Sequence, residues 1–252
     1  MGLTHYLNIE RVVFYAEPNK QISESEILKF RYLARELLKN KPIQYILGET
    51  EFMGLKIRVN QHVLIPRPET EEMVSDINSK VENPEVIIDF CTGSGGIALA
   101  LKNHFKNATV TGVDLNVEAL KIAEANAKFN QLLVGFKKDN VLKPELSYPL
   151  ADLIVANPPY VTEVEKSQMQ ANVLDYEPAL ALFVPDNDPL KFYKAIIRLN
   201  VDNLKPKGWF FLEINEKFGE EVLSLMRESG IVKNLALNHD LNGKPRWICG
   251  QK

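Results

Sequence analysis

The sequence predicts an α/β fold in which helices cover a mostly parallel, Rossmann-like sheet of seven strands, behind a small helical subdomain at the N-terminus. Three observations support this fold class. Short apolar segments alternate with helical periodicity from Val86 onward, a glycine-rich segment follows the first of these strands, and residues 1–41 follow helical spacing. A functional site is therefore expected at the carboxyl ends of the parallel strands.

The composition is typical of a globular protein in a reducing cytosol. Of the 252 residues, 45% are hydrophobic and 25% are charged, which supplies a full core and argues against a disordered chain. The net charge of −3 argues against a protein that wraps nucleic acid. Cys91 and Cys249 form no disulfide framework or zinc pattern, so we expect a cytoplasmic location and no metal site. No segment reaches about 18 continuous apolar residues, so neither a membrane span nor an export signal is expected.

A helix is expected close to the N-terminus. Residues 1–41 follow helical spacing, and Ser23 and Glu26 have the spacing of a capping box at a helix start. Pro42 should end this helix, because proline lacks the N–H group that a helix interior needs.

A hairpin and a second helix are expected next. The segment "EFMGLKIRV", Glu51–Val59, is typical of two short strands with Gly54 in the turn between them. Pro68 suits the first turn of a helix that begins with several glutamates. We therefore divide the chain into residues 1–60, a helical N-terminal unit with a hairpin linker, and residues 61–252, the α/β domain.

The α/β domain is expected to alternate strands with helices. One helix ends near Leu101, another is capped by Asp188-Pro189 and runs to Leu204, and a later one ends near Glu228. The last two strands should form an antiparallel pair. The seven expected strands are EVIIDF (85–90), ATVTGVD (108–114), a weaker one at 133–137, ADLIVA (151–156), GWFFLEI (208–214), IVKNLAL (231–237) and PRWICG (245–250).

The segment "DFCTGSGG", Asp89–Gly96, connects a strand to a helix. Its glycines would let the backbone approach a ligand, and the helix N-terminus offers free N–H groups. A tight turn without a ligand is the alternative, since the full G-x-G-x-x-G spacing is missing. Asp114 ends the second strand, where an acid can bind both ribose hydroxyls, although it could also cap the next helix. Asp139 and Asn140 follow the third strand, where an adenine would lie, so these strand ends together predict an adenosine-containing cofactor.

The segment "DLIVANPPYV", Asp152–Val161, runs from an apolar strand into two prolines. Adjacent prolines remove two N–H donors and fix two φ angles, which leaves a rigid ledge of carbonyl acceptors. Nicotinamide chemistry has no use for such acceptors, whereas methyl transfer to a nitrogen does. An amide nitrogen is a poor nucleophile because its lone pair is delocalised, so a site that methylates it must hold both of its N–H hydrogens on acceptors. The Asn157 side-chain carbonyl and the Pro158 backbone carbonyl could be those acceptors, and Tyr160 could pack flat on the target group. A proline-rich turn without a ligand is the alternative.

Four segments together resemble the HemK/PrmC family. They are "PIQYILGETEFMGL", "VLIPRPETE", "DFCTGSGG" and "IVANPPYV". This family comprises S-adenosylmethionine-dependent methyltransferases that modify the glutamine nitrogen in the Gly-Gly-Gln loop of peptide-chain release factors. The resemblance runs from about Pro42 to the C-terminus. It implies a class I methyltransferase fold, S-adenosylmethionine as the cofactor, release factors as partners, and residues 1–60 as a unit that docks them.

The resemblance also implies roles for individual residues. Asn157, Pro158 and Tyr160 would be catalytic, and together with Pro159 they would bind the substrate. Cys91 replaces a glycine that is usual in the family, and the glycine pair usual after "EPALAL" is absent from "FVPDNDPL". Asn140 stands where an aromatic residue is usual. The residues implied to bind the cofactor are Cys91, Thr92, Gly93, Ser94, Gly95, Asp114, Asp139, Asn140 and Asn157.

Two other functions remain open from the sequence. A nucleic-acid adenine N6-methyltransferase shares the Asn-Pro-Pro-Tyr tetrad, but it would normally add a base-reading module and a basic surface. A binding-only protein could retain the cofactor fold without turnover. Arg67 suits either a substrate anchor or a structural salt bridge, and Glu177 either orients the ledge or caps a turn. We expect no stable nucleic-acid partner, no membrane contact and a monomer.

Overall fold

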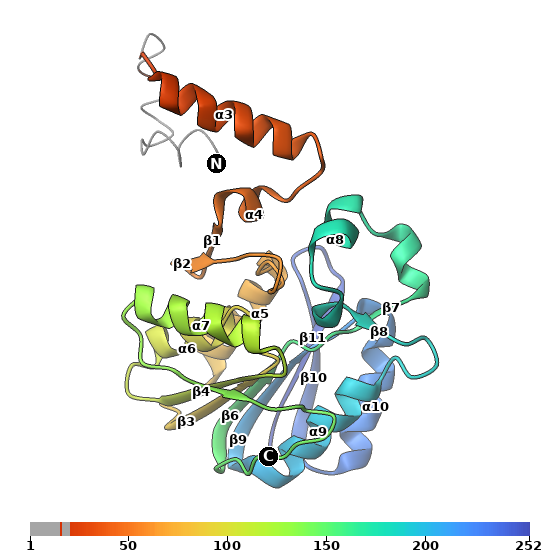
Figure 1. The fold of residues 1–252 in the computed structure, drawn as a ribbon. Coiled ribbons are helices and arrows are strands. Elements are labelled where there is room, and N and C mark those ends of the chain that lie inside the picture. Colours follow the sequence, from red (N-terminus) through yellow and green to blue (C-terminus); the bar gives the residue numbers. More distant parts are fainter. Residues whose placement is uncertain (1–15, 17–20) are drawn as a thin grey trace.

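The computed structural model of this chain describes residue 16 and residues 21–252. Part of the helical pattern expected for residues 1–41 lies outside these described residues. The predicted capping box is confirmed at the start of α3, Glu24–Leu37, where the Glu26 N–H donates to the Ser23 hydroxyl and the Ser23 N–H donates to the Glu26 carboxylate. The helix α3 stands away from the rest of the molecule (Figure 1).

A short helix and a hairpin connect α3 to the main body. The helix α4, Ile43–Leu47, begins directly after Pro42 and was not predicted. Strands β1, Glu49–Phe52, and β2, Leu55–Arg58, pair antiparallel, which confirms the hairpin. Gly54 lies in the turn with a φ of 74°, a left-handed conformation that glycine adopts without strain.

The main body contains the predicted seven-stranded sheet, in the order β10-β11-β9-β6-β3-β4-β5. All neighbouring strands pair parallel except β11, which pairs antiparallel with both β9 and β10. The order reverses between β3 and β6, so the chain crosses the sheet there. The strands are β3 Val86–Phe90, β4 Thr109–Asp114, β5 Gly135–Lys138, β6 Ala151–Ala156, β9 Leu204–Glu213, β10 Lys233–His239 and β11 Pro245–Gln251.

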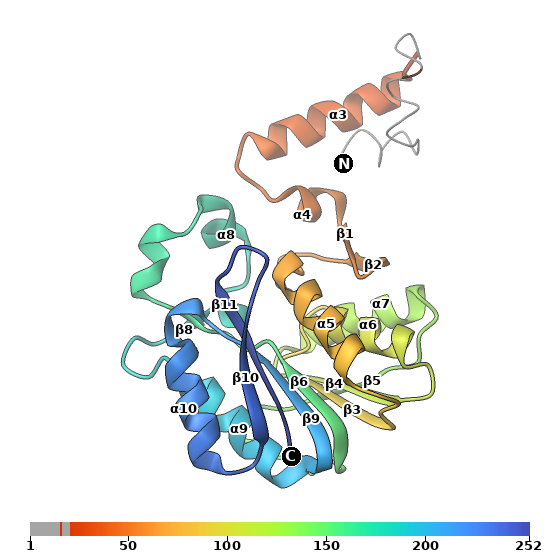
Figure 2. The same ribbon diagram turned by 180° about the vertical axis from the view of Figure 1, so that it is seen from behind.

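Helices cover both faces of the sheet (Figures 1 and 2). On one face lie α5 Pro68–Lys80, α6 Gly96–His104 and α7 Val117–Phe129. On the other face lie α9 Lys191–Asn203 and α10 Gly219–Ser229, with the short turn of helix η3 Glu216–Phe218 before α10. Pro68 occupies the first turn of α5 as predicted.

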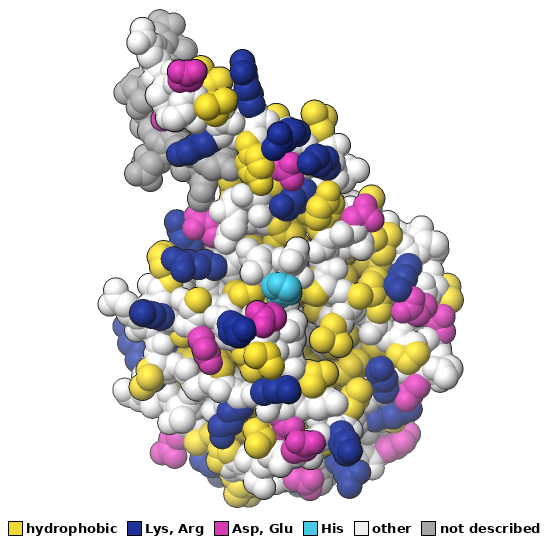
Figure 3. Space-filling model, in the orientation of Figure 1, with side chains coloured by type: hydrophobic (Ala, Val, Ile, Leu, Met, Phe, Trp, Pro, Cys, Tyr) yellow, Lys and Arg dark blue, Asp and Glu magenta, His cyan; other side chains and the backbone are white. Residues whose placement is uncertain are grey.

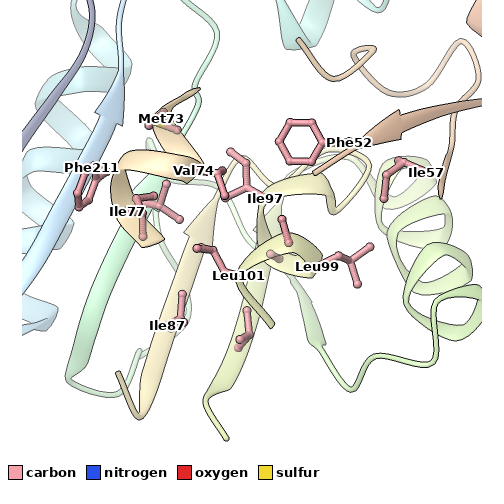
Figure 4. Packing of buried hydrophobic residues seen from close by; sticks show 14 of the residues in the cluster. Phe52, Ile57, Met73, Val74, Ile77, Ile87, Ile97, Leu99, Leu101 and Phe211 are labelled. Carbon is pink, nitrogen blue, oxygen red and sulfur yellow. The ribbon is translucent and has the colours of Figure 1, made fainter. Parts of the chain in front are cut away.

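Each face has its own hydrophobic core. The first core combines α5, α6 and strand residues such as Ile87 with Phe52 and Ile57 from the hairpin (Figure 4). Phe52 and Ile57 are almost fully buried, so the hairpin packs into the core of the sheet rather than projecting from it. Because burying a large apolar side chain contributes about 1.5–3 kcal/mol, these two residues fix the hairpin against α6 and α7.

A single asparagine adds a polar tie between the hairpin and the sheet. Asn126, on α7, is fully buried. Its Oδ1 accepts the Arg58 N–H at 2.8 Å, and its Nδ2 donates to the carbonyls of Arg58 at 3.0 Å and Ser94 at 2.9 Å. One side chain therefore joins β2 to the segment that precedes α6.

The expected boundary between α9 and the next strand was wrong. The helix has Leu190 as its N-cap, whereas the Asp188 carboxylate bonds the Lys194 ammonium at 2.8 Å. It ends at Asn203, and Leu204 begins β9 in register with Ala151. Leu204 is fully buried in the sheet, and that pairing overrides the helical spacing of its side chain.

Between β6 and α9 the chain forms a series of short elements that were not predicted. They lie together beyond the carboxyl end of β6 (Figure 1). These elements are β7 Val161–Thr162, the turn η1 Val164–Gln168, α8 Ala171–Tyr176, the turn η2 Ala179–Ala181 and β8 Phe183–Val184.

Candidate active site

A pocket lies at the carboxyl ends of the central parallel strands, where the fold predicts it. Figure 3 shows hydrophobic side chains interspersed with charged ones over the middle of one face of the molecule, with a histidine near its centre. Of the predicted site residues, Gly95, Pro158 and Tyr160 do not line the pocket. Those that do are Cys91, Thr92, Gly93, Ser94, Asp114, Asp139, Asn140, Asn157 and Pro159.

In the segment Asp89–Gly96, here called the glycine loop, Gly93 and Gly95 have different structural roles. Gly93 has a φ of 53°, and a Cβ atom there would meet nothing within 4 Å, so it leaves open space beside the pocket. Gly95 has a φ of 80°, and its Cβ would lie 3.0 Å from the Cβ of Ala123 on α7. Gly93 therefore provides room for a ligand, and Gly95 allows the close approach of the loop to α7.

Cys91 occupies a backbone conformation that glycine would adopt more easily. Its φ is 61°, in the left-handed region that costs an L-residue about 1–2 kcal/mol. Burial raises the pKa of its thiol well above the usual value, and the charges of Asp114 and Asp89 add to the effect. The thiol therefore stays protonated at neutral pH and is a poor nucleophile.

Asp89 is a functional candidate that the sequence analysis did not single out. It is 0% exposed, and its Oδ2 accepts the Thr92 hydroxyl at 2.6 Å and the Ala98 N–H at 3.2 Å. Its Oδ1 is buried without a hydrogen-bond partner in the described part of the chain. Burial raises the pKa of this carboxyl to about 7. A buried acidic residue with a spare acceptor, next to a glycine loop, is the signal that could have identified it.

Asp114 joins the end of β4 to the glycine loop. Its Oδ2 accepts the Gly93 N–H and its Oδ1 accepts the Asn116 N–H, both at 2.8 Å. Asn116, rather than Asp114, caps α7 by accepting the Glu118 N–H, so the helix-cap alternative for Asp114 was wrong. Burial raises the pKa of Asp114, although its backbone hydrogen bonds act in the opposite direction.

Asp139 organises the loop that follows β5. It accepts backbone N–H groups from Asn140, Glu145 and Leu146, and the Tyr148 hydroxyl donates to it at 2.5 Å. Partial burial works to raise the pKa of this carboxyl, but the hydrogen bonds outweigh it, so the pKa lies below its usual value. The loop is thereby held with Asn140 facing the pocket.

The segment Asn157–Tyr160, here called the ledge, is held by a buried carboxylate. Asn157 Nδ2 donates to the Thr70 hydroxyl oxygen at 3.3 Å, and the Thr70 hydroxyl donates to Glu213 Oε2 at 2.6 Å. The Tyr160 hydroxyl donates to Glu213 Oε1 at 3.0 Å. Sequence reasoning missed Glu213, and it did not foresee that Thr70 contacts the ledge. A glutamate inside the apolar strand "GWFFLEI" was the available signal, since an isolated buried carboxylate needs partners.

Arg67 and Glu177 form a salt bridge on the rim of the pocket. The guanidinium donates to Glu177 Oε1 at 2.6 Å, and the Ile65 N–H donates to Oε2 at 3.2 Å. The Glu177 side chain is 1% exposed, whereas Arg67 lines the pocket and is partly exposed. Of the two readings of Arg67, the salt bridge is confirmed, and it ties the loop before α5 to the segment after α8.

Comparison with known proteins identifies the chain. The Methyltransferase small domain matches residues 69–176, and the PrmC N-terminal domain matches residues 2–48. The release factor glutamine methyltransferase of Flavobacterium psychrophilum is 41% identical in an alignment 251 residues long that covers 98% of this chain and 88% of that protein. The enzyme of the same description from Bacteroides thetaiotaomicron is 40% identical over 249 residues, with the same coverage. The chain belongs to the release factor glutamine methyltransferase family.

A solved structure agrees with this assignment at the level of the fold. A methyltransferase from Pyrococcus furiosus is 19% identical and superposes with a TM-score of 0.56, covering 79% of this chain and 89% of that one. The predicted class I methyltransferase fold is thus confirmed. Within the described part of the chain, no helix combines the length and the apolar character that crossing a membrane requires.

As a member of the release factor glutamine methyltransferase family, the chain is a methyltransferase that uses S-adenosylmethionine as its methyl donor. The residues present fit this molecule. The open space beside Gly93 lets a ligand approach the backbone of the glycine loop, and the polar side chains of Asp114, Asn140 and Asn157 line the same pocket. Among residues 16 and 21–252, no three His, Cys, Asp or Glu side chains gather where they could hold a metal ion.

Proposed function

We propose that this chain methylates the side-chain amide nitrogen, N5, of the glutamine in the Gly-Gly-Gln loop of peptide-chain release factors. The observation that carries the proposal is the orientation of Asn157. Its Nδ2 is engaged with Thr70, so its carbonyl oxygen is the group left for a ligand in the pocket. The backbone carbonyl of Pro158, the next residue along the ledge, would be the second acceptor, so that the two N–H groups of a primary amide each have a partner.

The proposed chemistry needs orientation rather than a strong base. S-adenosylmethionine supplies an electrophilic methyl group on a sulfonium sulfur. Asn157 and Pro158 hold both amide protons, which turns the nitrogen lone pair toward that methyl group. A carbon–nitrogen bond forms as the sulfur–carbon bond breaks, and the nitrogen then releases one proton to water. Apolar residues such as Leu180 and Phe192 line the same pocket and exclude bulk water from the reacting groups.

The remaining site assignments are part of this proposal. Cys91–Gly95 would contact the cofactor, with Asp114 on its ribose and Asp139-Asn140 beside its adenine. Pro159 lines the pocket, which supports its role in substrate binding. The Tyr160 hydroxyl donates to a buried carboxylate, which supports a Tyr160 ring held in one fixed orientation. Contact between this ring and the target group would require the substrate to reach beyond the residues that line the pocket.

The proposal extends to the partner and its docking. Residues 1–60 would dock the release factor, and residues 61–252 would carry the chemistry. Release factors act on ribosomes, so the reaction would take place in the cytoplasm, with the enzyme as a monomer and without a stable nucleic-acid partner. The names of the two relatives support the substrate, because both are release factor glutamine methyltransferases.

Mass spectrometry of a purified release factor tests the proposal. After incubation with the protein and S-adenosylmethionine, we expect one added methyl group on the glutamine of the Gly-Gly-Gln loop. Asn157→Ala should lower the rate at least about a hundredfold while cofactor binding persists, because one of the two acceptors is lost. Asn130→Ala, which removes a hydrogen-bonded asparagine outside the pocket, should methylate normally.

Other outcomes would redirect the assignment. If cofactor binding is intact but no methyl group is added, the acceptor is a different nitrogen, and a nucleic-acid adenine is the next to test. If Asn157→Ala methylates the release factor at the wild-type rate, the proposed mechanism is wrong.

A further inference from the structure

We infer that Glu213 is a positioning residue that sets the orientation of the Asn157 amide through Thr70. The inference rests on the proposed function, because the orientation matters only if Asn157 accepts a hydrogen bond from the substrate amide. According to this inference, the Asn157 carbonyl faces the pocket only because of Glu213, a carboxylate that does not itself line the pocket.

The starting point is the geometry at the end of β9. Glu213 is 1% exposed and accepts a hydroxyl proton on each oxygen, from Thr70 at 2.6 Å and from Tyr160 at 3.0 Å. An ionised carboxylate can only accept hydrogen bonds. Both hydroxyl protons are therefore directed at Glu213 and are unavailable to other groups.

This arrangement fixes the amide of Asn157. Thr70 has one hydroxyl proton, and Glu213 takes it, so the Thr70 oxygen can offer only lone pairs to its second neighbour. Asn157 must then face Thr70 with its NH₂ group, as it does at 3.3 Å. A rotated amide would place two oxygen acceptors against each other at Thr70. It would also present NH₂ to the pocket, where a glutamine amide likewise brings N–H donors.

The ledge has a second tie that holds its backbone but not its amide. Asn215 Nδ2 donates to the Tyr160 carbonyl at 3.1 Å, and the Asn215 N–H donates to the Tyr193 hydroxyl at 2.9 Å. These bonds place the prolines. They leave the choice between the carbonyl and NH₂ ends of Asn157 to Thr70 and Glu213.

The charge state of Glu213 controls this choice. Burial raises the pKa of Glu213, while the hydrogen bonds from Thr70 and Tyr160 act in the opposite direction. The acceptor-only form is therefore lost with falling pH earlier than it would be for an exposed glutamate. The titratable and charged groups that face Glu213 are Glu69 on α5, Tyr160 on the ledge, Tyr193 on α9 and Arg246 on β11.

A matched pair of variants at Thr70 tests the inference. Thr70→Val keeps the shape of the side chain and removes the hydroxyl, whereas Thr70→Ser keeps the hydroxyl and removes the methyl group. In release-factor methylation we expect Thr70→Val to lower kcat by about tenfold to a hundredfold, with KM for the release factor and Kd for S-adenosylmethionine within about twofold. Thr70→Ser should stay within about threefold of wild type. Equal losses in both variants, or a wild-type kcat for Thr70→Val, would overturn the inference.

The pH profile of a Glu213 variant provides a second readout. Wild-type kcat should fall as pH drops through the raised pKa of Glu213, because protonation turns that acceptor into a donor. Glu213→Gln should have a lower plateau without this acidic limb. An unchanged limb in a folded Glu213→Gln protein would overturn the inference, and if that variant does not fold, the Thr70 pair decides.

The same assay separates this inference from the proposed function. If the wild-type enzyme does not methylate the release factor, the proposed function fails and the Thr70 comparison has no substrate. If the wild type is active and Asn157→Ala is inactive, while Thr70→Val matches the wild type, only the role of Glu213 fails.

Discussion

The two walls of the pocket are held together in different ways. In the glycine loop, the side chain of Asp89 bonds residues 3 and 9 positions away, and the Gly93 N–H reaches Asp114, 21 positions along the chain. In the ledge, the Asn157 side chain bonds a residue 87 positions away, and Tyr160 bonds residues 53 and 55 positions away.

This difference separates the locally folded glycine loop, the proposed cofactor wall, from the ledge, the proposed acceptor wall, which exists only in the complete fold. The glycine loop needs β3, α6, β4 and α7, which follow one another along the chain. The ledge needs α5 and the end of β9 in place before its amide and its ring are oriented. Substitutions in the two walls should therefore differ in what they change, and three of them test this.

The largest loss of stability is expected from removing Glu177, the buried carboxylate that ties the loop before α5 to the segment after α8. Glu177→Ala removes the partner of Arg67 and the acceptor of the Ile65 N–H, both more than 100 positions away. We expect a loss of about 3 kcal/mol in the free energy of unfolding, because a buried carboxylate is lost together with its salt bridge and the hydrogen bond that it accepts from the Ile65 N–H. Urea denaturation measures it. Glu118→Ala, which removes an exposed pair with Lys121, should cost far less stability, and equal losses would contradict the comparison.

A smaller effect is expected from crowding the cofactor wall. Gly95→Ala combines a left-handed backbone with a Cβ atom 3.0 Å from the Cβ of Ala123. We expect a loss of about 2 kcal/mol, measured by urea denaturation. Gly230→Ala shares the left-handed backbone, with a φ of 64°, but meets nothing within 4 Å, so it should cost only about 1 kcal/mol. If the two variants lose the same stability, close packing of the loop on α7 is not what requires Gly95.

The smallest effect is a change in pH dependence within the cofactor wall. Because the folded pKa of Asp89 is about 7 and the unfolded value is about 3.8, the folded state holds more protons between these values. This carboxyl therefore makes the protein less stable as pH rises through that window, with the full contribution present below it. Asp89→Asn should gain about 1 kcal/mol over wild type as pH rises from 5.5 to 6.5, measured by denaturation at both pH values.

Asp139→Asn is the control for that measurement. The pKa of Asp139 is lowered, so its contribution is present above its unfolded pKa and is lost only as pH falls further. Its stability difference from wild type should stay flat between pH 5.5 and 6.5. A parallel change in both variants would mean that burial of Asp89 is not the cause.

The same contrast explains what could be predicted from the sequence. The strands of the sheet were predictable because buried parallel strands are short apolar runs, and the glycine loop was predictable because its contacts are local. Asp114 was found for the same reason, since it follows a strand in a fixed position relative to the loop.

The support of the ledge could not be predicted in this way. Thr70 looks like any first-turn residue of a helix that begins with proline and glutamates, and its partner Glu213 lies 143 positions away. Likewise, Leu204 has the spacing of a helical residue until its pairing with Ala151 is known. These features depend on which strands become neighbours, and one sequence does not contain that information locally.

The buried amide of Asn126 has a consequence for how the molecule fluctuates. Lifting the β1–β2 hairpin away from the domain would break both bonds of Asn126 to Arg58 and expose Phe52 and Ile57 to water, at a cost of about 1.5–3 kcal/mol for each apolar side chain. The hairpin and the glycine loop should therefore open together as one cooperative unit rather than fray separately. In native-state hydrogen exchange, the amide proton of Arg58 would then be protected to the same degree as those of the loop, and slow exchange would extend from the sheet into the N-terminal hairpin.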